Sequence, residues 1–485
     1  MENHYDVIVV GGGTGGAVMS KFLAQRRIDV ALFEKLRFED LHKICGDATS
    51  EWHFEKVSKI DPKNKIEPPK GDEFYNYIKG FTFYSPSFES FKIPTDGDGW
   101  IIARDRFGKR LIREARDAGV KLFEETTVLK PLLDPTSNNV IGLQIKTKEN
   151  EIKDISSHIV VDASGMAGIV RRQIDEDKAQ WDSVIRHYDL AAAHRELVQF
   201  DNPIDEPQNI RLYFDAEACP GGYFWIFPQN EYAANVGLGV EPRRIQGGPK
   251  VAYREWEKRE PKLFNGNHKV VHEGGATVPL RRPMDTLVFG GLVLIGDAGA
   301  CVKSTDGGGI GLSMTSASHA VGPIVHALQE RNYSRDGPLW DYNVNFMRDL
   351  GFKEAPLAIA KVTLVTATNK ELTTLLGNKV VTPEDLYDLN NGDPLKMGLK
   401  SKIVRAWRGK TVIPFLLRLL NTMKRMDTAR ELYANYPDNW NDFLVWKQKI
   451  VKLYQDKERA IKYYTETNQP DMLEKIGISK PSTTS

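Results

Sequence analysis

Short apolar runs and amphipathic segments alternate along the first two thirds of the chain. The first run, residues 5–10, ends in a glycine-rich turn and is followed by a helical pattern over residues 17–25. A second apolar run, residues 29–33, ends on Glu34. Apolar runs of this length are typical of buried strands, and strands that alternate with helical segments predict a parallel sheet. The N-terminal part is therefore predicted to be a Rossmann-like unit.

Later segments predict two kinds of strand. Apolar runs that end in a glycine turn recur at residues 158–162 and 292–295, and we expect them to be buried strands. Short strands separated by turns predict antiparallel structure; they comprise a hairpin at 81–85 and 89–93, a meander over 127–157, and strands at 210–214, 222–227 and 234–240. Helices are predicted at 109–118 and 312–330, and the pattern is helical from residue 331 onward.

A chain of 485 residues is too long for one hydrophobic core, so several domains are expected. The predicted fold class is α/β, or α+β over the whole chain, with a Rossmann-like domain, an antiparallel β-sheet substrate domain and a C-terminal helical domain. The expected boundaries are 1–75, 100–180 and 276–335 for the discontinuous nucleotide-binding domain, 76–99 and 181–275 for the β-rich domain, and 336–485 for the helical domain.

The turn after the first strand carries the pattern Gly-x-Gly-x-x-Gly. In this pattern the first glycine allows the turn, the second lets the backbone approach a pyrophosphate, and the third lets the helix pack close to the strand. An acid about 20 residues further on is expected to bind a ribose hydroxyl. The predicted ligands of a dinucleotide, which at this point is either NAD or FAD, are Gly11, Gly13, Thr14, Gly15, Gly16, Glu34 and Lys35.

Composition narrows the classes of function. The formal net charge is +1, which gives no reason to expect nucleic-acid binding. The three cysteines, Cys45, Cys219 and Cys301, lie far apart, and neither they nor the histidines show metal-ligand spacing, so no metal is expected. The sequence has no apolar run long enough for a transmembrane helix and no signal peptide, so a cytoplasmic location is predicted.

Two later motifs decide between NAD and FAD. Asp162-Ala-Ser-Gly165, with Arg171 downstream, resembles the Asp-Gly signature of flavoprotein hydroxylases, and Gly296-Asp297 resembles the motif whose aspartate holds the FAD ribityl chain. Together with the first glycine motif, they imply the p-hydroxybenzoate-hydroxylase-like fold and hence an FAD-binding domain. The turn 307–311 would place a helix N-terminus near the flavin, where it favours negative charge on the reduced ring.

Four further motifs resemble the geranylgeranyl reductases, in particular the archaeal enzymes that saturate the isoprenoid chains of membrane lipids. These motifs are Cys45-Gly-Asp47, Arg104-x-x-Phe107, Pro220-Gly-Gly-Tyr-Phe-Trp-Ile-Phe-Pro228 and Gly307-Gly-Gly-Ile-Gly311. The resemblance implies FAD contacts at Cys45, Gly46, Asp47, Ala48, Arg104, Val128, Asp162, Gly165, Gly296, Asp297, Gly308, Gly309 and Ile310. It implies substrate contacts at Pro220, Gly221, Gly222, Tyr223, Trp225 and Phe227.

The chemistry implied by the resemblance is demanding, because an isolated double bond has no electron sink. We expect protonation to lead and hydride to follow, with cationic charge stabilised by the rings of Tyr223 and Trp225. These two residues and Cys45 are the candidate catalytic residues. For Cys45 a purely packing role is an equal alternative, because a free thiol is a weak acid. The sequence does not identify the proton donor.

The partners implied are an isoprenoid lipid and an electron donor, either NADPH or a reduced ferredoxin. Geranylgeranyl diphosphate, a digeranylgeranylglyceryl lipid and a quinone tail all remain open as substrates. Basic and apolar residues interleave over 396–430, which is typical of a helix at a membrane surface and equally of an amphipathic helix packed on the catalytic domains. Peripheral contact with a membrane is thus one of two interpretations.

Two other functions fit the same motifs. One is a flavin-dependent monooxygenase or halogenase; halogenases carry a related Trp-x-Trp-x-Ile-Pro motif, in which Tyr223 and Phe227 of this chain replace two positions. The other is a non-catalytic protein that binds FAD and lipid. Bound FAD that is reduced and then reoxidised by an added isoprenoid would argue against a non-catalytic role.

Overall fold

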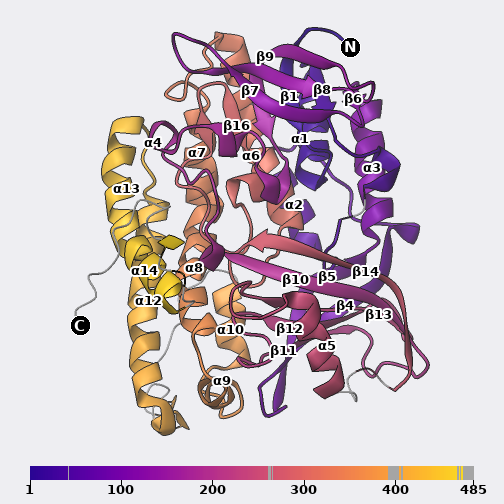
Figure 1. The fold of residues 1–485 in the computed structure, drawn as a ribbon, viewed down its shortest axis with the longest axis vertical. Coiled ribbons are helices and arrows are strands. Elements are labelled where there is room, and N and C mark those ends of the chain that lie inside the picture. The colour runs from indigo at the N-terminus through magenta and orange to yellow at the C-terminus, as the bar shows by residue number, and fades with distance from the viewer. Residues whose placement is uncertain are drawn as a thin grey trace.

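Two sheets and a C-terminal group of helices make up the computed structural model (Figure 1). It describes residues 1–41, 43–259, 264, 266–390, 404–405, 408–466, 469 and 471–472. In Figure 1 the first sheet lies at the top, the second lies below it, and α12, α13 and α14 line the left side. The α/β fold class predicted from the sequence is confirmed.

The first sheet is parallel at its centre. Its strands follow the order β15-β16-β9-β1-β2-β6, and β8 and β7 continue antiparallel from β9. The strands are β1 (His4–Val10), β2 (Val30–Phe33), β6 (Lys121–Phe123), β7 (Thr127–Leu133), β8 (Val140–Lys146), β9 (Ile152–Asp162), β15 (Val288–Phe289) and β16 (Leu292–Leu294). The strands at 158–162 and 292–295 and the meander over 127–157 are therefore present as predicted.

Strand register brings the nucleotide motifs together. Val10 pairs with both Phe33 and Asp162, and Asp162 pairs with Leu294, so four strands end at one edge of the sheet. In open parallel sheets ligands bind at this carboxyl edge. The first glycine motif, Glu34, Asp162–Gly165 and Gly296–Asp297 each lie at the end of one of these four strands.

The second sheet has the order β14-β10-β13-β12-β11-β4-β5-β3. Its strands are β3 (Ala48–Ser50), β4 (Phe74–Tyr84), β5 (Ser90–Ile102), β10 (Leu190–Phe200), β11 (Asn209–Tyr213), β12 (Tyr223–Pro228), β13 (Ala233–Val240) and β14 (His268–Pro279). The β4–β5 hairpin is longer than its predicted strands. A register shift near Gly80 lets the pairing continue beyond the polar residues 95–98, which the sequence pattern treats as the end of the strand.

The domain boundaries predicted from the sequence stay a prediction.

Helices cover both sheets and form the C-terminal part. Helix α1 (Thr14–Ala24) packs on β1 and β2, with α3 (Arg104–Asp117) and α6 (Ile310–Glu330) against it. Helix α2 (Glu51–Ile60) contacts α6, β3 and β5, α5 (Pro249–Arg259) packs on β10 and β13, and α4 (Glu176–Ala179) is a short helix after β9. The C-terminal helices are α7 (Trp340–Phe346), α8 (Phe352–Val365), α9 (Asn369–Leu376), α10 (Pro383–Asn390), α12 (Ile413–Ala434), α13 (Trp440–Tyr454) and α14 (Asp456–Glu466). Helix α3 begins at Arg104, earlier than predicted, because Ala103 already serves as its N-cap.

Within the described part of the chain, no helix has the length and apolar character needed to cross a bilayer.

Candidate active site

The glycine turn between β1 and α1 is fixed by close backbone approaches. Gly11 has φ +100°, and a Cβ there would lie 2.7 Å from the Ala163 carbonyl oxygen. A Cβ on Gly16 would overlap the carbonyl oxygen of Gly11. Among the described residues no side chain caps the α1 N-terminus at Gly13, so backbone N–H groups there remain available to an anion. The turn therefore fits a pyrophosphate.

Glu34 ends β2 beside this turn. Its carboxylate is buried and accepts hydrogen bonds from the backbone N–H groups of Gly12 (2.8 Å) and Leu36 (3.0 Å). The neighbouring Lys35 is exposed. Glu34 thus ties the glycine turn to β2, at the place where the motif expects a ribose-binding acid.

Asp162 ends β9 and is fully buried. Its Oδ1 accepts hydrogen bonds from the Ser164 backbone N–H (3.0 Å) and hydroxyl (2.5 Å). Its Oδ2 accepts from the N–H groups of Val170 and Arg171, each at 2.9 Å. Both oxygens are therefore used to shape the turn that carries Gly165, and that turn contacts Gly296–Gly299. The geometry gives Asp162 a role in holding the turn.

Asp297 lies in the 3-10 turn Gly296–Gly299 after β16. Gly296 has φ +56°, and a Cβ there would lie 2.8 Å from the hydroxyl oxygen of Ser313 on α6. Burial raises the pKa of Asp297, and the positive charges of Lys43 and Arg104 oppose this rise. A carboxylate held in this way suits a partner that donates hydroxyl hydrogens, as a ribityl chain does.

The start of α6 completes the expected cofactor region. Gly308 donates its N–H to the Asp306 Oδ1 (2.8 Å), and Gly309 is the N-cap, followed by Ile310. The His53 ring lies against α6 so closely that a Cβ on Gly311 would overlap it. Burial, together with the charge of Lys303, lowers the pKa of His53 to about 4. His53 is therefore neutral at physiological pH.

Three aromatic side chains of β12 share one face, which we call the aromatic face: Tyr223, Trp225 and Phe227. Adjacent ring centroids are 6.0 Å apart. The Tyr223 hydroxyl donates a hydrogen bond to the Asp306 carbonyl oxygen (2.7 Å), in the loop before α6. The intervening Phe224 points to the other side and stacks on Trp256 of α5. The alternation expected from the sequence is thus present.

The segment Cys45–Asp47 packs against this face. A Cβ on Gly46 would lie 2.7 Å from the Phe227 ring, and Asp47 has φ +71°. The Cys45 Sγ accepts a hydrogen bond from the Asp47 N–H (3.3 Å). Burial, with the nearby charge of Asp47, raises the pKa of the Cys45 thiol. Cys45 is therefore a protonated, weakly acidic group beside Tyr223.

Asn235 of β13 connects the aromatic face to this segment. It accepts a hydrogen bond from the Trp225 Nε1 (3.1 Å) and donates to the Cys45 carbonyl oxygen (2.7 Å) and to the Asp47 Oδ2 (2.9 Å). The sequence-based prediction missed Asn235. The available signal was a single amide in the otherwise apolar strand 233–240, and Asn235 is completely buried.

Asp47 lies between the two parts of the site. It is 4% exposed, and its Oδ1 has no hydrogen-bond partner among the described atoms. Burial raises its pKa to about 6, against the opposing charges of Arg104 and Arg195. Arg104, in the first turn of α3, donates to the Thr14 hydroxyl (3.1 Å) at the start of α1. The glycine turn, Asp47 and the aromatic face therefore form one continuous region.

The remaining predicted residues shape the site from further away. The Pro220 carbonyl accepts the Glu241 N–H (2.9 Å), Gly221 has φ +77°, and a Cβ on Gly222 would overlap the Gly239 carbonyl oxygen. These three residues form the tight turn that starts β12. Val128 lies in β7 and is buried in the main core, and Ala48 begins β3 against the cluster that contains Trp225.

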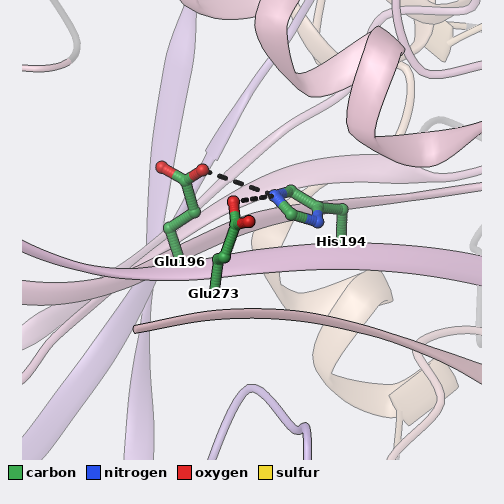
Figure 2. Close-up of side chains that lie close together, drawn as sticks. All are labelled: His194, Glu196 and Glu273. Carbon is green, nitrogen blue, oxygen red and sulfur yellow. Dashed lines mark hydrogen bonds and ion pairs between the residues drawn. The ribbon is translucent and has the colours of Figure 1, made fainter. Parts of the chain in front are cut away.

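A separate group of possible metal ligands lies in the second sheet (Figure 2). His194, Glu196 and Glu273 point toward one another, with the His194 Nε2 3.4 Å from Glu196 Oε1 and 3.9 Å from Glu273 Oε2. Arg254 pairs with Glu196 at 2.5 Å, and Lys250 pairs with Glu273 at 2.6 Å. These cations neutralise the carboxylates, so the cluster is accounted for as an ion-pair network.

Comparisons with known proteins agree on one family. A family model described as geranylgeranyl reductase catalytic domain matches residues 189–278, the span from β10 to β14. A digeranylgeranylglycerophospholipid reductase of Sulfolobus acidocaldarius is 30% identical over 95% of this chain and 99% of that protein. Digeranylgeranylglycerophospholipid reductase 2 of Methanopyrus kandleri is 29% identical over 83% of this chain and 96% of that protein.

Solved structures share the fold at lower identity. A geranylgeranyl bacteriochlorophyll reductase-like protein of Thermoplasma acidophilum superposes with a TM-score of 0.70 at 21% identity, covering 87% of this chain and 99% of that one. A myxobacterial FAD-dependent chondrochloren halogenase superposes with a TM-score of 0.60 at 16% identity, covering 84% and 97%. At these identities the likeness shows the fold alone.

Proposed function

The chain belongs to the family of the digeranylgeranylglycerophospholipid reductases, and from this premise we propose that it saturates carbon–carbon double bonds of geranylgeranyl chains in a membrane lipid or its precursor. The observation that carries the proposal is the position of the aromatic face, which meets the glycine turns of a dinucleotide site through Asp47 and Asn235. An aromatic surface beside a redox cofactor suits an apolar polyene better than a polar substrate.

FAD is the proposed cofactor. The uncapped α1 N-terminus would hold the pyrophosphate, Glu34 the ribose, and Asp297 the ribityl hydroxyl groups. Arg104, whose Nε is buried and lacks a hydrogen-bond partner within the described ranges, has a donor left for the cofactor. When bound and reduced, FAD supplies hydride.

The residues of the chain bind the isoprene unit, exclude water from it and stabilise the positive charge that develops on it. The aromatic face would hold one isoprene unit, and Tyr223 would be kept in place by its hydrogen bond to the Asp306 carbonyl. Positive charge that develops on a trisubstituted carbon is attracted to the faces of Tyr223 and Trp225. Excluding water protects such a carbon from hydration. Cys45 lines the same space as a neutral thiol.

An anaerobic assay with chemically reduced, FAD-loaded enzyme tests the proposal. Digeranylgeranylglyceryl phosphate, geranylgeranyl diphosphate and a polyprenyl quinone are offered separately, and products are weighed by mass spectrometry. The proposal expects the first two to gain two hydrogens per reduced bond while the flavin is reoxidised. Reduced flavin that persists with every lipid would instead indicate a protein that binds FAD and lipid without catalysis. An oxygenated or halogenated product formed only in air would indicate a monooxygenase or halogenase.

The electron donor is proposed to be NADPH or a reduced ferredoxin. Both reach the flavin without a second nucleotide-binding motif in this chain. Anaerobic mixing of the oxidised holoenzyme with each donor, followed by flavin absorbance, separates them. The donor that bleaches the flavin at a rate at least equal to turnover is the physiological class.

Peripheral contact with a membrane is proposed for the N-terminal half of α12. Ile413, Leu417 and Leu420 recur at helical spacing and are 53%, 62% and 47% exposed. Exposed lysines flank them at 410 and 424. Lys396, Lys400 and Lys402 of the predicted interfacial stretch lie outside the described residues. An apolar stripe between cations suits an anionic lipid surface.

A further inference from the structure

Reduction of an isolated double bond needs a proton donor close to the aromatic face. The Tyr223 hydroxyl donates its hydrogen to a carbonyl, and burial raises its pKa far above the physiological range. Burial also raises the pKa of the Cys45 thiol. His53 has its pKa lowered to about 4 and carries no spare proton at neutral pH. These three groups are poor acids at neutral pH.

Asp47 differs from these three groups, because its pKa of about 6 leaves it a competent acid near neutral pH. Only 4% of it is exposed, and one carboxyl oxygen is held by the Asn235 amide at 2.9 Å. The other oxygen is buried and lacks a hydrogen-bond partner within the described part of the chain. A buried polar atom without a partner is unusual, and at a functional site it points to a group that meets a ligand. Because Asn235 also binds the Trp225 indole, the position of the carboxyl is coupled to the aromatic face.

We propose that Asp47 is the carboxylic acid that protonates the double bond, and that Asn235 is the positioning residue that aims it. This inference rests on the proposed reductase function. The left-handed backbone of Asp47 (φ +71°) and the close packing of Gly46 on Phe227 fix the segment that presents the carboxyl. Asp47 interacts electrostatically with Arg104 of the cofactor region and accepts a hydrogen bond from Asn235, which binds the substrate face, so it links the two regions.

The step balances in atoms and electrons. The carboxyl O–H bond breaks, and the π electron pair of the alkene forms a C–H bond with that proton at one carbon. The other carbon becomes electron-deficient and receives a hydride from the two-electron donor, reduced flavin. Asp47 is left as a carboxylate, which regains a proton from water after the product leaves. The charged and titratable groups around it are Arg104 of α3, Arg195 of β10 and Cys45 of its own segment.

The test uses the full-length, FAD-loaded chain with geranylgeranyl diphosphate as probe. Asp47→Asn keeps the shape of the side chain but removes the acid, and we expect reduction to fall by about a hundredfold or more. Flavin absorbance should verify that the variant is loaded with FAD before the rates are compared. Wild-type enzyme incubated in D₂O should deliver deuterium to the protonated carbon, with a rate that declines as pH rises through about 6. Asp47→Asn should lose this decline.

Two further variants distinguish a proton-donating role of Asp47 from a purely structural one. Asn235→Ala removes a hydrogen bond that lowers the pKa of Asp47, so the pH at which the rate declines should move upward while kcat falls more than KM rises. Glu354→Gln is the matched competitor, because burial raises the pKa of Glu354 to about 7 and one of its oxygens also lacks a hydrogen-bond partner in the described structure. Reduction should survive Glu354→Gln.

A readout without turnover completes the test. Infrared difference spectra of the holoenzyme should contain a protonated-carboxyl C=O component that titrates near pH 6 and is lost in Asp47→Asn, whereas the component that titrates near pH 7 should be lost only in Glu354→Gln. Loss of activity in Glu354→Gln with retention in Asp47→Asn would overturn the inference, as would an unchanged pH profile in Asp47→Asn. If wild-type enzyme itself reduces no lipid, it is the proposed function that fails.

Discussion

Among single residues, Asp47 lies in a buried environment that disfavours its ionised carboxylate. Its pKa is raised from 3.8 to about 6, chiefly by burial, so the folded state binds a proton more tightly than the unfolded state. Stability is therefore greatest below the unfolded pKa and declines as pH rises through the folded pKa. The difference between the two pKa values corresponds to about 3 kcal/mol.

The first prediction follows from this linkage. Asp47→Asn removes the titration, so its unfolding free energy relative to wild type should increase by about 2 kcal/mol between pH 4 and pH 8, because part of the total change already occurs below pH 4. Urea unfolding of both proteins at each pH measures the difference and cancels the titration of all other groups. A difference that stays flat with pH would show that Asp47 titrates normally.

The second prediction concerns the two faces of β12. Trp225→Ala should lower alkene reduction by about tenfold, because the cation–π contribution is lost, while FAD stays bound. Phe224→Leu is the matched control, since Phe224 points away from the aromatic face into the core under α5. It should lower stability by about 1 kcal/mol and leave turnover per folded molecule unchanged. Equal loss of turnover in both variants would remove the aromatic face as the substrate surface.

At the scale of elements, the turn between β1 and α1 depends on backbone proximity. Gly16→Ala places a methyl group onto the carbonyl of Gly11, so the strand and helix must separate, and we expect FAD binding to be lost. Gly108→Ala is the matched helical control, because no described atom lies within 4 Å of the Cβ it adds to α3. It should raise stability by about 1 kcal/mol. FAD titration and thermal unfolding measure both effects, and normal FAD affinity in Gly16→Ala would contradict the prediction.

Helix α12 carries the membrane prediction. Leu417→Glu introduces a charge into the exposed apolar stripe and should abolish flotation with vesicles that contain anionic lipid. Val445→Glu on α13 changes a similarly exposed residue (55%) outside the stripe and should leave flotation intact. High salt should weaken the binding of wild type, because each lysine near the surface contributes about 1 kcal/mol through electrostatic attraction. Absence of flotation in wild type at low salt would remove the proposal.

At the scale of the whole molecule, local patterns predicted the order of elements well. Strands β1, β2, β9 and β16 follow apolar runs, and the motifs after them meet because parallel strands end at one edge. The family predicted from the motif Tyr223–Pro228 is confirmed by the family model and by the relative from Sulfolobus acidocaldarius. Its substrate contacts stay a prediction.

The features of the site that sequence patterns did not predict depend on contacts between segments that are distant in the chain. Asn235 and Asp47 are 188 positions apart, and no local pattern relates an amide in β13 to a carboxyl after a loop. The use of both Asp162 oxygens by the following turn is likewise a three-dimensional fact. The early start of α3 depends on Ala103, which lacks a recognisable capping side chain. Each of these contacts is specified by packing, which single-sequence patterns do not encode.

Reduction of isolated double bonds in geranylgeranyl lipids is the activity proposed for this chain. Its most direct test is the mass of digeranylgeranylglyceryl phosphate after anaerobic incubation with stoichiometric, chemically reduced holoenzyme. The lipid should gain two hydrogens per reduced bond, and each reduced bond should be matched by one reoxidised flavin. Unchanged lipid mass with flavin that remains reduced would contradict it.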